Sequence, residues 1–417
     1  MEIKKQDHRE IIKDLDLCIL DEKAGQGLPI LLPNWVIIRN QIQQFIRQKW
    51  KEYNLQEVIT PILGSEELYR TSGHLAHYQD YMFPAMSRNN ETYYLRPMTC
   101  PHHCLIYQQK PRSYRKLPFR LCENSLLFRY EASGAMKGLE RVRWMELVDH
   151  HIFVAHEQLA AEFKKNYLFV ADILASFNFQ ISRLICALHD SNNPEKYHSD
   201  KNLWEYSEKL LVGALDELKL EYTVLRGEAA FYGPKLDIEV QAADGKNITL
   251  ATIQLDFVLP QKFGLQYIDN EQKLQTPAII HQTPIGTYQR FIALLLEQAQ
   301  GKLPFWLAPI QLVILPLNNQ EEVKKYSESL QKKLFSNNLR SEIWSEKTLN
   351  YRIRQIYKKK IPYYLIIGEK EINDAYILPN RNERSLNLVH VYSNEAKNLT
   401  EKELVEKLWM ESKRKSK

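Results

Sequence analysis

The sequence predicts an α+β domain over residues 1–303, followed by a smaller α/β domain over residues 304–417. In the first part, strands fall in hairpins between long amphipathic helices, which is typical of an antiparallel sheet with helices packed on it. The composition changes at LPFWLAPIQ, residues 303–311, and strands then alternate with helices. That alternation predicts a small domain with a largely parallel sheet.

The elements of the first domain follow from the spacing of its apolar residues. Ile38, Ile42 and Phe45 recur at helical spacing and predict a helix over 35–53. A strand is expected over 55–62, at an edge or at its own end near Pro61, because proline cannot donate to a ladder. Further helices are expected at 66–73, 157–175, 200–218 and 287–300. Further strands are expected at 93–96, 179–188, 222–225 and 278–281, as a hairpin over 128–151, and in the segments GEAAFYGPKLDIEV and NITLATIQLDFVLP.

The second domain is predicted from the same kind of pattern. Strands are expected at 311–315, 339–344 and 362–367. Helices are expected at 321–335, 351–359 and 401–411, and the second of them is basic.

The composition is that of an ordinary globular protein, with 44% hydrophobic and 26% charged residues. A net charge of +5 permits a nucleic-acid partner without requiring one. The five cysteines are odd in number and irregularly spaced, which argues against a disulfide framework and for a reducing compartment. The start, MEIKKQDHRE, lacks the apolar region of a signal peptide, and no apolar run is long enough to span a bilayer. We therefore expect a cytoplasmic protein with no membrane partner.

The predicted hairpin over 128–151 has an unusual face. Side chains two apart in a strand share a face, so Arg129 and Glu131 lie together on the first strand. Arg141, Asp149 and His151 share a face of the returning strand by the same rule. Two arginines, two acids and a histidine do not make a normal core. They indicate the floor of a site that binds something anionic.

Three residues could bind a metal: Cys100 at the N-cap of a predicted helix, and His151 and His281 at strand ends. One cysteine and two histidines would leave a fourth zinc position open for a substrate. A cysteine at a helix N-terminus is also expected to lose its proton more easily. Spacing alone leaves a local set of Cys100, His103 and Cys104 open. It also leaves open the simpler view that the histidines are hydrogen-bonded and the cysteines belong to the core.

Arg290 lies in the first turn of the helix that follows PIGTYQR, with Thr287 as its N-cap. A cation there opposes the helix dipole, and a nearby anion would resolve the conflict. With Arg129 and Arg141 it suggests a clamp for a triphosphate. The alternative is an arginine that is solvated beside a carboxylate. The sequence contains no P-loop and no GxGxxG motif.

FRYEASG, the following RVR and the later GTYQRF resemble motifs 2 and 3 of class II aminoacyl-tRNA synthetases. The ordered set is similar to the threonyl-tRNA synthetase family in particular: DHRE, RPMTCPHH, VDHHIF, AFYGPK, TIQLDF and IIHQTPIGTYQRF, then LAPIQ and GEKE. These pieces keep their order over essentially the whole chain. The resemblance implies a class II catalytic domain, an α/β anticodon-binding domain, and a homodimer in which residues 55–61 form motif 1 at the interface.

The resemblance implies a threonine–tRNA ligase. Such an enzyme activates L-threonine with ATP to threonyl-adenylate and transfers it to the 3′ end of tRNA(Thr). It also implies one Zn²⁺ per chain, which selects threonine over valine, and Mg²⁺ that arrives with ATP. The family usually carries N-terminal editing domains, which this chain lacks, so the polypeptide is expected not to clear Ser-tRNA(Thr).

The roles implied by the resemblance divide among four groups of residues. The implied zinc ligands are Cys100, His151 and His281. The implied ATP-binding residues are Arg129, Glu131, Arg141, Thr287 and Arg290, of which Arg129 and Arg290 are catalytic. Threonine would be bound by Met98, Asp149, Tyr232, Lys235 and Gln254, and the anticodon would be contacted by Lys347, Arg354 and Glu371.

Two other functions are consistent with the resemblance. One is a catalytically inactive, synthetase-like regulator that binds tRNA; the retained arginines and metal-binding residues argue against it. The other is a class II ligase for another amino acid, such as serine or proline. The complete cysteine and histidine set favours threonine.

Overall fold

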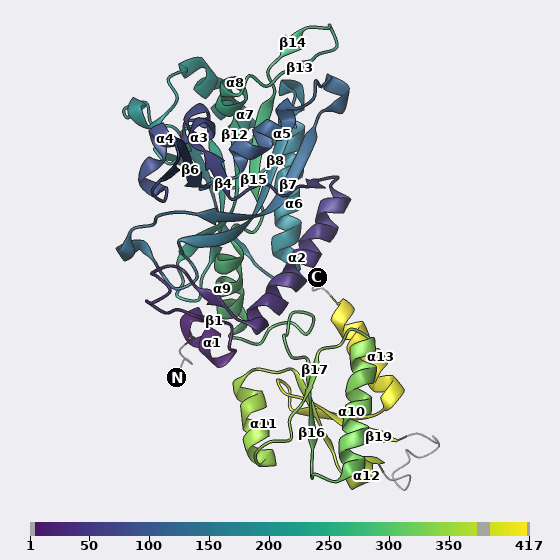
Figure 1. Cartoon of the computed structure of the whole chain (residues 1–417). Helices are drawn as coiled ribbons and strands as arrows, with labels where there is room; N and C mark the ends of the chain where they lie inside the picture. The colour runs from purple at the N-terminus through teal and green to yellow at the C-terminus, as the bar shows by residue number, and fades with distance from the viewer. Residues whose placement is uncertain (1–4, 373–383, 415–417) are drawn as a thin grey trace. The chain divides into compact units, whose positions relative to one another are not determined.

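The computed structural model describes residues 5–372 and 384–414 (Figure 1). The chain forms two compact units. The larger unit comprises Leu20–Pro29 and Ile46–Leu294. The second unit comprises Met1–Ile19, Ile30–Phe45 and Leu295–Lys417. The domain boundary at residues 303/304 stays a prediction.

The larger unit is built on an eight-stranded sheet. Its strands are β3 (Gln56–Glu57), β7 (Phe119–Phe128), β8 (Trp144–Val154), β9 (Ile181–Leu188), β10 (Thr223–Arg226), β11 (Lys235–Gln241), β12 (Asn247–Asp256) and β15 (Ala278–Thr283). Their order is β10-β9-β11-β12-β15-β8-β7-β3. All neighbours are antiparallel except at the two edges, where β10 runs parallel to β9 and β3 runs parallel to β7. The predicted, mainly antiparallel sheet is therefore confirmed.

The hairpin of β7 and β8 differs from its prediction at the loop end. β7 ends at Phe128, so Arg129 and Glu131 follow the strand and do not share one of its faces. β8 begins at Trp144, so Arg141 precedes it. The connection between the two strands contains a 3₁₀ turn over Ser133–Ala135. Arg141 is instead drawn toward Glu131, with which it forms an ion pair of 2.8 Å.

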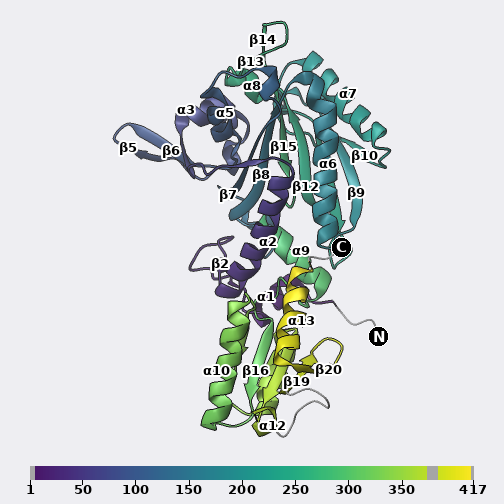
Figure 2. The ribbon, with the colours of Figure 1, turned by 90° about the vertical axis from the view of Figure 1, so that its right-hand side faces the viewer.

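Helices cover both faces of this sheet. Those of the larger unit are α3 (Glu66–Ser72), α4 (His74–His77), α5 (Cys100–Gln108), α6 (Leu159–Ser176), α7 (Lys201–Glu217) and α8 (Val258–Lys262). Figure 2 shows α3 and α5 on one side of the sheet and α6 and α7 on the other. The sequence sets these elements locally. In α7, for example, the Asp200 side chain caps the first turn by accepting from the Leu203 N–H, and the apolar face buries Trp204 and Leu211.

Two helices contribute residues to both units, α2 (Pro33–Glu52) and α9 (Tyr288–Ala299). Small sheets complete the region up to residue 294. They are the pair β1 (Cys18–Ile19) and β2 (Ile30–Leu31), the three strands β4 (Leu63–Ser65), β5 (Met86–Arg88) and β6 (Glu91–Leu95), and the pair β13 (Tyr267–Ile268) and β14 (Leu274–Gln275).

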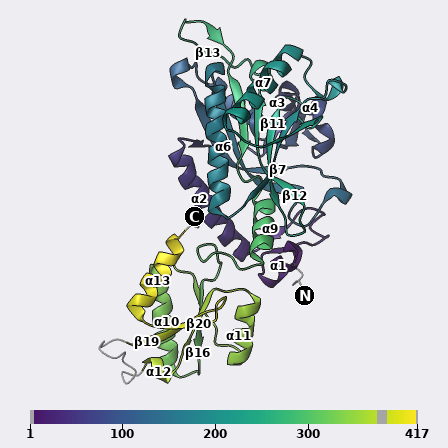
Figure 3. The same cartoon turned by 180° about the vertical axis from the view of Figure 1, so that it is seen from behind.

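The second unit contains a five-stranded sheet between helices. Its elements are α1 (His8–Asp14), β16 (Leu312–Pro316), α10 (Glu321–Ser336), β17 (Ser341–Ile343), α11 (Leu349–Lys358), β18 (Tyr363–Ile367), α12 (Glu369–Ile372), β19 (Ser385–His390), β20 (Glu395–Thr400) and α13 (Glu401–Lys413). Alternation along β16 assigns its two faces: Leu312 and Ile314 pack with α10 and α13, whereas Val313 and Leu315 pack with α11. Figure 3 shows α11 opposite α10 and α13 across the sheet.

The prediction of a largely parallel sheet holds for only one side of this second unit. β17, β16 and β18 are parallel, but β18, β19 and β20 are antiparallel. The last two strands were not predicted. β20 is mostly exposed and polar, so its sequence lacks the apolar alternation that marks a strand.

None of the helices in the described part of the chain is long and apolar enough to cross a membrane. All five cysteines are free and buried.

Candidate active site

The larger unit contains a cavity of about 350 Å³ on the face of the sheet that carries α5. Its lining includes all five residues predicted to bind threonine, which are Met98, Asp149, Tyr232, Lys235 and Gln254. It also includes the three predicted metal ligands and Arg129. The other four residues predicted to bind ATP, which are Glu131, Arg141, Thr287 and Arg290, are not among the described residues that line it.

The sheet register places four of these residues in one row. Lys235 of β11 pairs with Gln254 of β12, Gln254 pairs with His281 of β15, and His281 pairs with His151 of β8. Directly paired side chains on one face of an antiparallel sheet lie about 4.5–5.5 Å apart at Cβ. The row therefore forms a continuous polar floor that runs across four strands.

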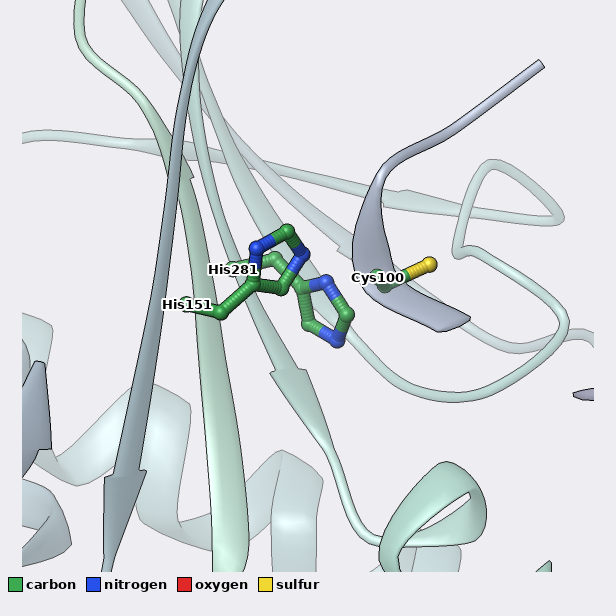
Figure 4. Close-up of side chains that lie close together, drawn as sticks. All are labelled: Cys100, His151 and His281. Atoms are coloured by element: carbon green, nitrogen blue, oxygen red, sulfur yellow. The ribbon is translucent and has the colours of Figure 1, made fainter. Parts of the chain in front are cut away.

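The metal-binding candidates meet at one end of this floor (Figure 4). One ligand atom from each of Cys100, His151 and His281 lies within 4.8 Å of the others, and all three residues are buried. They come from three elements: the first residue of α5, β8 and β15. One sulfur and two imidazole nitrogens suit Zn²⁺, and three protein ligands leave a fourth position free. The donor set therefore fits this metal.

The alternative metal-binding set, Cys100, His103 and Cys104, is not among the ligand clusters that the described residues form. His103 lies against His151 and Glu123, at 2.8 Å and 3.2 Å between the hydrogen-bonding atoms. Cys104 is fully buried in an apolar cluster. These contacts occupy both residues within the interior.

The electrostatics around Cys100 reverse one expectation. Thr99, and not Cys100, is the N-cap of α5, and burial raises the pKa of the Cys100 thiol well above its ordinary value. The expectation of an easily deprotonated cysteine is wrong because desolvation outweighs the helix dipole. A thiolate at this position needs a positive charge beside it, such as a metal ion. Burial, with the charges of His103 and His281, lowers the pKa of His151, which favours the neutral imidazole that metals bind.

Polar groups surround the space beside the metal candidates. The Tyr232 hydroxyl donates to Gln254 Oε1 at 2.5 Å, and its ring stacks on His281 with centroids 5.0 Å apart. Lys235 forms an ion pair of 2.6 Å with Asp237. Burial raises the pKa of the Asp149 carboxyl, so a cationic ligand would stabilise its charged form.

The three arginines form a second part of the site. Burial and the positive charges of Arg129 and Arg141 lower the pKa of the Arg290 guanidinium. Arg290 donates to the carbonyl oxygens of Glu140 and Thr249, both at 3.0 Å. Thr287 caps the helix as predicted, since its hydroxyl accepts from the Arg290 N–H at 3.1 Å. Mutual repulsion among the arginines would be relieved by a bound anion.

The predicted anticodon residues lie in the second unit. Lys347 and Arg354 are exposed. Glu371 Oε2 accepts a hydrogen bond from the backbone N–H of Gly368 at 2.8 Å, so its carboxylate has a local structural partner.

Sequence reasoning missed several residues of the cavity wall. Thr252 and Thr283 line it and share a hydrogen bond of 2.8 Å between their hydroxyls. Thr252 lies two residues before Gln254 in β12, so strand alternation could have found it. Phe231 and His77, which stack with centroids 5.1 Å apart, also line the cavity. No pattern within the chain signals that contact.

Comparisons with known proteins agree with this geometry. Residues 81–299 match the family model "tRNA synthetase class II core domain (G, H, P, S and T)", and residues 311–409 match an "Anticodon binding domain". The threonine–tRNA ligase of Geobacillus sp. strain WCH70 is 44% identical over 372 residues, which are 89% of this chain and 58% of that protein. The threonine–tRNA ligase of Ureaplasma parvum serovar 3 is 45% identical over 385 residues, which are 91% of this chain and 66% of that protein. The chain thus spans about three fifths to two thirds of the length of these relatives.

A solved structure gives the same relationship. The crystal structure titled as the RNA binding domain of threonyl-tRNA synthetase from Cryptosporidium parvum Iowa II matches with a TM-score of 0.88 and 33% identity. The match covers 97% of this chain and 98% of that one. The sheet, the cavity and these matches define the core of a class II aminoacyl-tRNA synthetase. Within that class, the chain belongs to the threonyl-tRNA synthetase family.

Proposed function

We propose that this protein is a threonine–tRNA ligase that uses ATP and releases AMP and diphosphate. The observation that carries the proposal is the polar row Lys235–Gln254–His281–His151, which Cys100 joins at the metal-binding end. A cluster of three arginines, Arg129, Arg141 and Arg290, lies beside the hairpin of β7 and β8. In this proposal, the hairpin of β7 and β8 would join an amino-acid site to an anion site.

In the first reaction, the threonine carboxylate attacks the α-phosphate of ATP and diphosphate leaves. Arg129 and Arg290 would stabilise the negative charge that develops there, and Arg141 would meet the other phosphates. Glu131 would face the adenine. Magnesium would arrive with the nucleotide. Most of the rate enhancement would come from position and charge, since no covalent step falls to the protein.

Selection of the amino acid would occur at Cys100, His151 and His281. A zinc ion held there would supply an electron-pair acceptor for the amino and hydroxyl groups of threonine. Asp149 would accept hydrogen bonds from the same amino acid, next to Tyr232 and Gln254. Valine has no hydroxyl group to offer, so it should be rejected strongly.

Serine keeps the hydroxyl group and lacks only a methyl group, a difference worth roughly 1–3 kcal/mol. The polypeptide should therefore charge serine at a low but measurable rate. We expect it to leave Ser-tRNA(Thr) intact, and rapid deacylation of that substrate by the polypeptide would contradict this expectation.

The tRNA would be held in part by the second unit, whose matched region carries the predicted residues Lys347, Arg354 and Glu371. Contacts of Lys347 and Arg354 with phosphates would make binding sensitive to salt.

We also propose a homodimer. Ile59 is 93% exposed and Ile62 and Leu63 are also exposed, so this segment offers the apolar surface that a subunit interface would cover. A reducing, cytoplasmic location would suit the five free cysteines.

The decisive experiment is ATP–diphosphate exchange measured over all amino acids, together with the zinc content of the protein. Exchange with threonine, weak exchange with serine and none with valine is the expected result. Cys100→Ala should lose both the metal and threonine-dependent exchange. No exchange with threonine would overturn the proposal: exchange with another amino acid would indicate a different ligase, and no exchange at all would indicate an inactive regulator.

A further inference from the structure

A buried chain of polar side chains leads from His151 away from the cavity. His151 Nδ1 lies 2.8 Å from His103 Nδ1, and His103 Nε2 lies 3.2 Å from Glu123 Oε2. The other oxygen of Glu123 lies 2.9 Å from Arg96 Nη2. These four residues are at most 2% exposed. None of the last three lines the cavity, so the substrate contacts described above do not explain them.

The contacts fix where the hydrogens must lie when His151 binds a metal. The Nδ1 atom faces His103, so Nε2 must offer its lone pair and Nδ1 must carry the hydrogen. His103 Nδ1 then accepts that hydrogen bond, and His103 Nε2 carries the second hydrogen. Glu123 is the acceptor for it, because a carboxylate only accepts. Every contact in the chain is satisfied by this one arrangement.

Glu123 is well suited to hold the end of this chain. Burial alone raises the pKa of its carboxyl, but the hydrogen bond from His103 and the charge of Arg96 lower it to about 2. The Thr60 hydroxyl donates to the same carboxylate oxygen at 2.7 Å. Because the charge of Arg96 balances that of Glu123, this series of hydrogen-bonded side chains adds no net charge beside the metal-binding candidates.

We propose that Glu123 and His103 are positioning residues that fix the tautomer and ring orientation of His151, so that Nε2 faces the metal. This inference rests on the proposed function, because it assigns a role toward the zinc that selects the amino acid. Neither residue touches the reacting atoms. They act by holding a ligand in its binding form, as hydrogen-bond partners of ligating histidines do in other metal sites.

His281 has its own anchor of a different kind. Its Nε2 lies 2.8 Å from Asp256 Oδ2, while Asp256 Oδ1 accepts from the N–H groups of Val258 and Leu259. This leaves Nδ1 of His281 for a metal. The two histidines therefore present unlike nitrogens, and each is fixed by a separate carboxylate. Disturbing Glu123 should alter His151 alone.

Glu123→Gln is the direct test. Its amide oxygen can still accept from Arg96, but its NH₂ group then faces His103 and makes His103 Nε2 an acceptor. His103 Nδ1 would carry the hydrogen and oppose the hydrogen on His151 Nδ1. We expect the zinc dissociation constant of the 417-residue protein, measured by competition with a chromophoric chelator, to rise about 10- to 100-fold.

Glu162→Gln is the matched control. Glu162 forms a part-buried pair with Arg120 at 2.6 Å and lies outside the cavity, so its loss tests for a general effect of removing an ion pair. Zinc affinity should be unchanged in this variant. Equal zinc affinity in folded Glu123→Gln and the parent would overturn the positioning role alone. A parent protein that binds no zinc at all would overturn the zinc role in the proposed function as well.

A second measurement needs no folded Glu123 variant. In zinc-loaded parent protein with ¹⁵N-labelled histidine, NMR should show the hydrogen of His151 on Nδ1 and that of His103 on Nε2, with His103→Gln used for assignment. The opposite tautomer at either histidine would overturn the inference.

Discussion

Arg290 is held by two backbone carbonyls and stands near two other arginines, an arrangement that costs free energy unless an anion is present. Arg290→Gln should therefore leave the melting temperature within a few degrees of the parent. The same change should slow ATP–diphosphate exchange about 100- to 1,000-fold, as the loss of one donor to a developing charge does.

Arg183→Gln is a suitable control because Arg183 is another hydrogen-bonded arginine of the same unit, paired with the Glu239 carboxylate at 2.7 Å and 43% exposed. Its exchange rate should match that of the parent. If Arg290→Gln retained full exchange with threonine, the role of this arginine at the phosphate would be wrong.

At the scale of single residues, sequence spacing could not decide which residues form the metal-binding set. Cys100, His151 and His281 stand 51 and 130 positions apart (151 − 100 and 281 − 151), whereas a competing set lay within five consecutive residues. The family resemblance made the selection, and the register between β8 and β15 explains how distant residues meet. The pKa of Cys100 could not be predicted, since the helix terminus is visible in sequence but desolvation is not.

At the scale of elements, the start of β11 depends on a close approach of two backbones. A Cβ atom on Gly233 would lie 1.8 Å from the carbonyl oxygen of Leu255 in β12, a clash that only a backbone shift can relieve. Gly233→Ala should displace Tyr232 and Lys235 on either side of it. We expect a loss of at least about 1–3 kcal/mol in unfolding free energy and a marked rise in KM for threonine.

Gly213→Ala in α7 is the matched control, since a Cβ atom on Gly213 would have no neighbouring atom within 4 Å. Alanine in a helix interior is favoured over glycine, so this variant should be more stable by about 0.5–1 kcal/mol with unchanged KM. Chemical denaturation measures the unfolding free energy of each variant, and steady-state kinetics measure its KM for threonine. An unaltered KM in Gly233→Ala would contradict the positioning role of this segment.

The sequence predicted most elements of the sheet but misplaced the hairpin that matters most. β7 runs over Phe119–Phe128, whereas the strand was expected to begin near its end. Its residues Glu123, Asn124 and Ser125 are polar, so the segment does not read as an apolar strand. They are polar because the strand contributes to a buried network, which only the three-dimensional arrangement reveals.

At the scale of the whole molecule, the proposed homodimer gives the next prediction. Ile59→Asp would place a charge in the apolar segment 59–63, and burial of an isoleucine contributes about 1.5–3 kcal/mol. The dimer dissociation constant should therefore rise about tenfold or more, as sedimentation velocity would measure. Leu274→Asp, at a side chain 64% exposed in β14, should leave self-association unchanged. Equal dissociation constants for Ile59→Asp and the parent would place any interface elsewhere.

The family and the α+β organisation of the chain could be predicted because ordered motifs run through its whole length. The strand β20 could not, because it is mostly exposed and polar and so lacks the apolar alternation that marks a strand.

The polar row across β11, β12, β15 and β8 has a consequence for how the protein matures. Its members are neighbours only in one register, and a slip of one residue in β15 would turn His281 to the opposite face. A chain still emerging from the ribosome contains Cys100 and His151 long before His281. High-affinity metal uptake should then begin only after residue 281 has been made and β15 has docked between β12 and β8. If zinc is the metal held there, its resistance to removal by a chelator would first appear when this part of the sheet is complete.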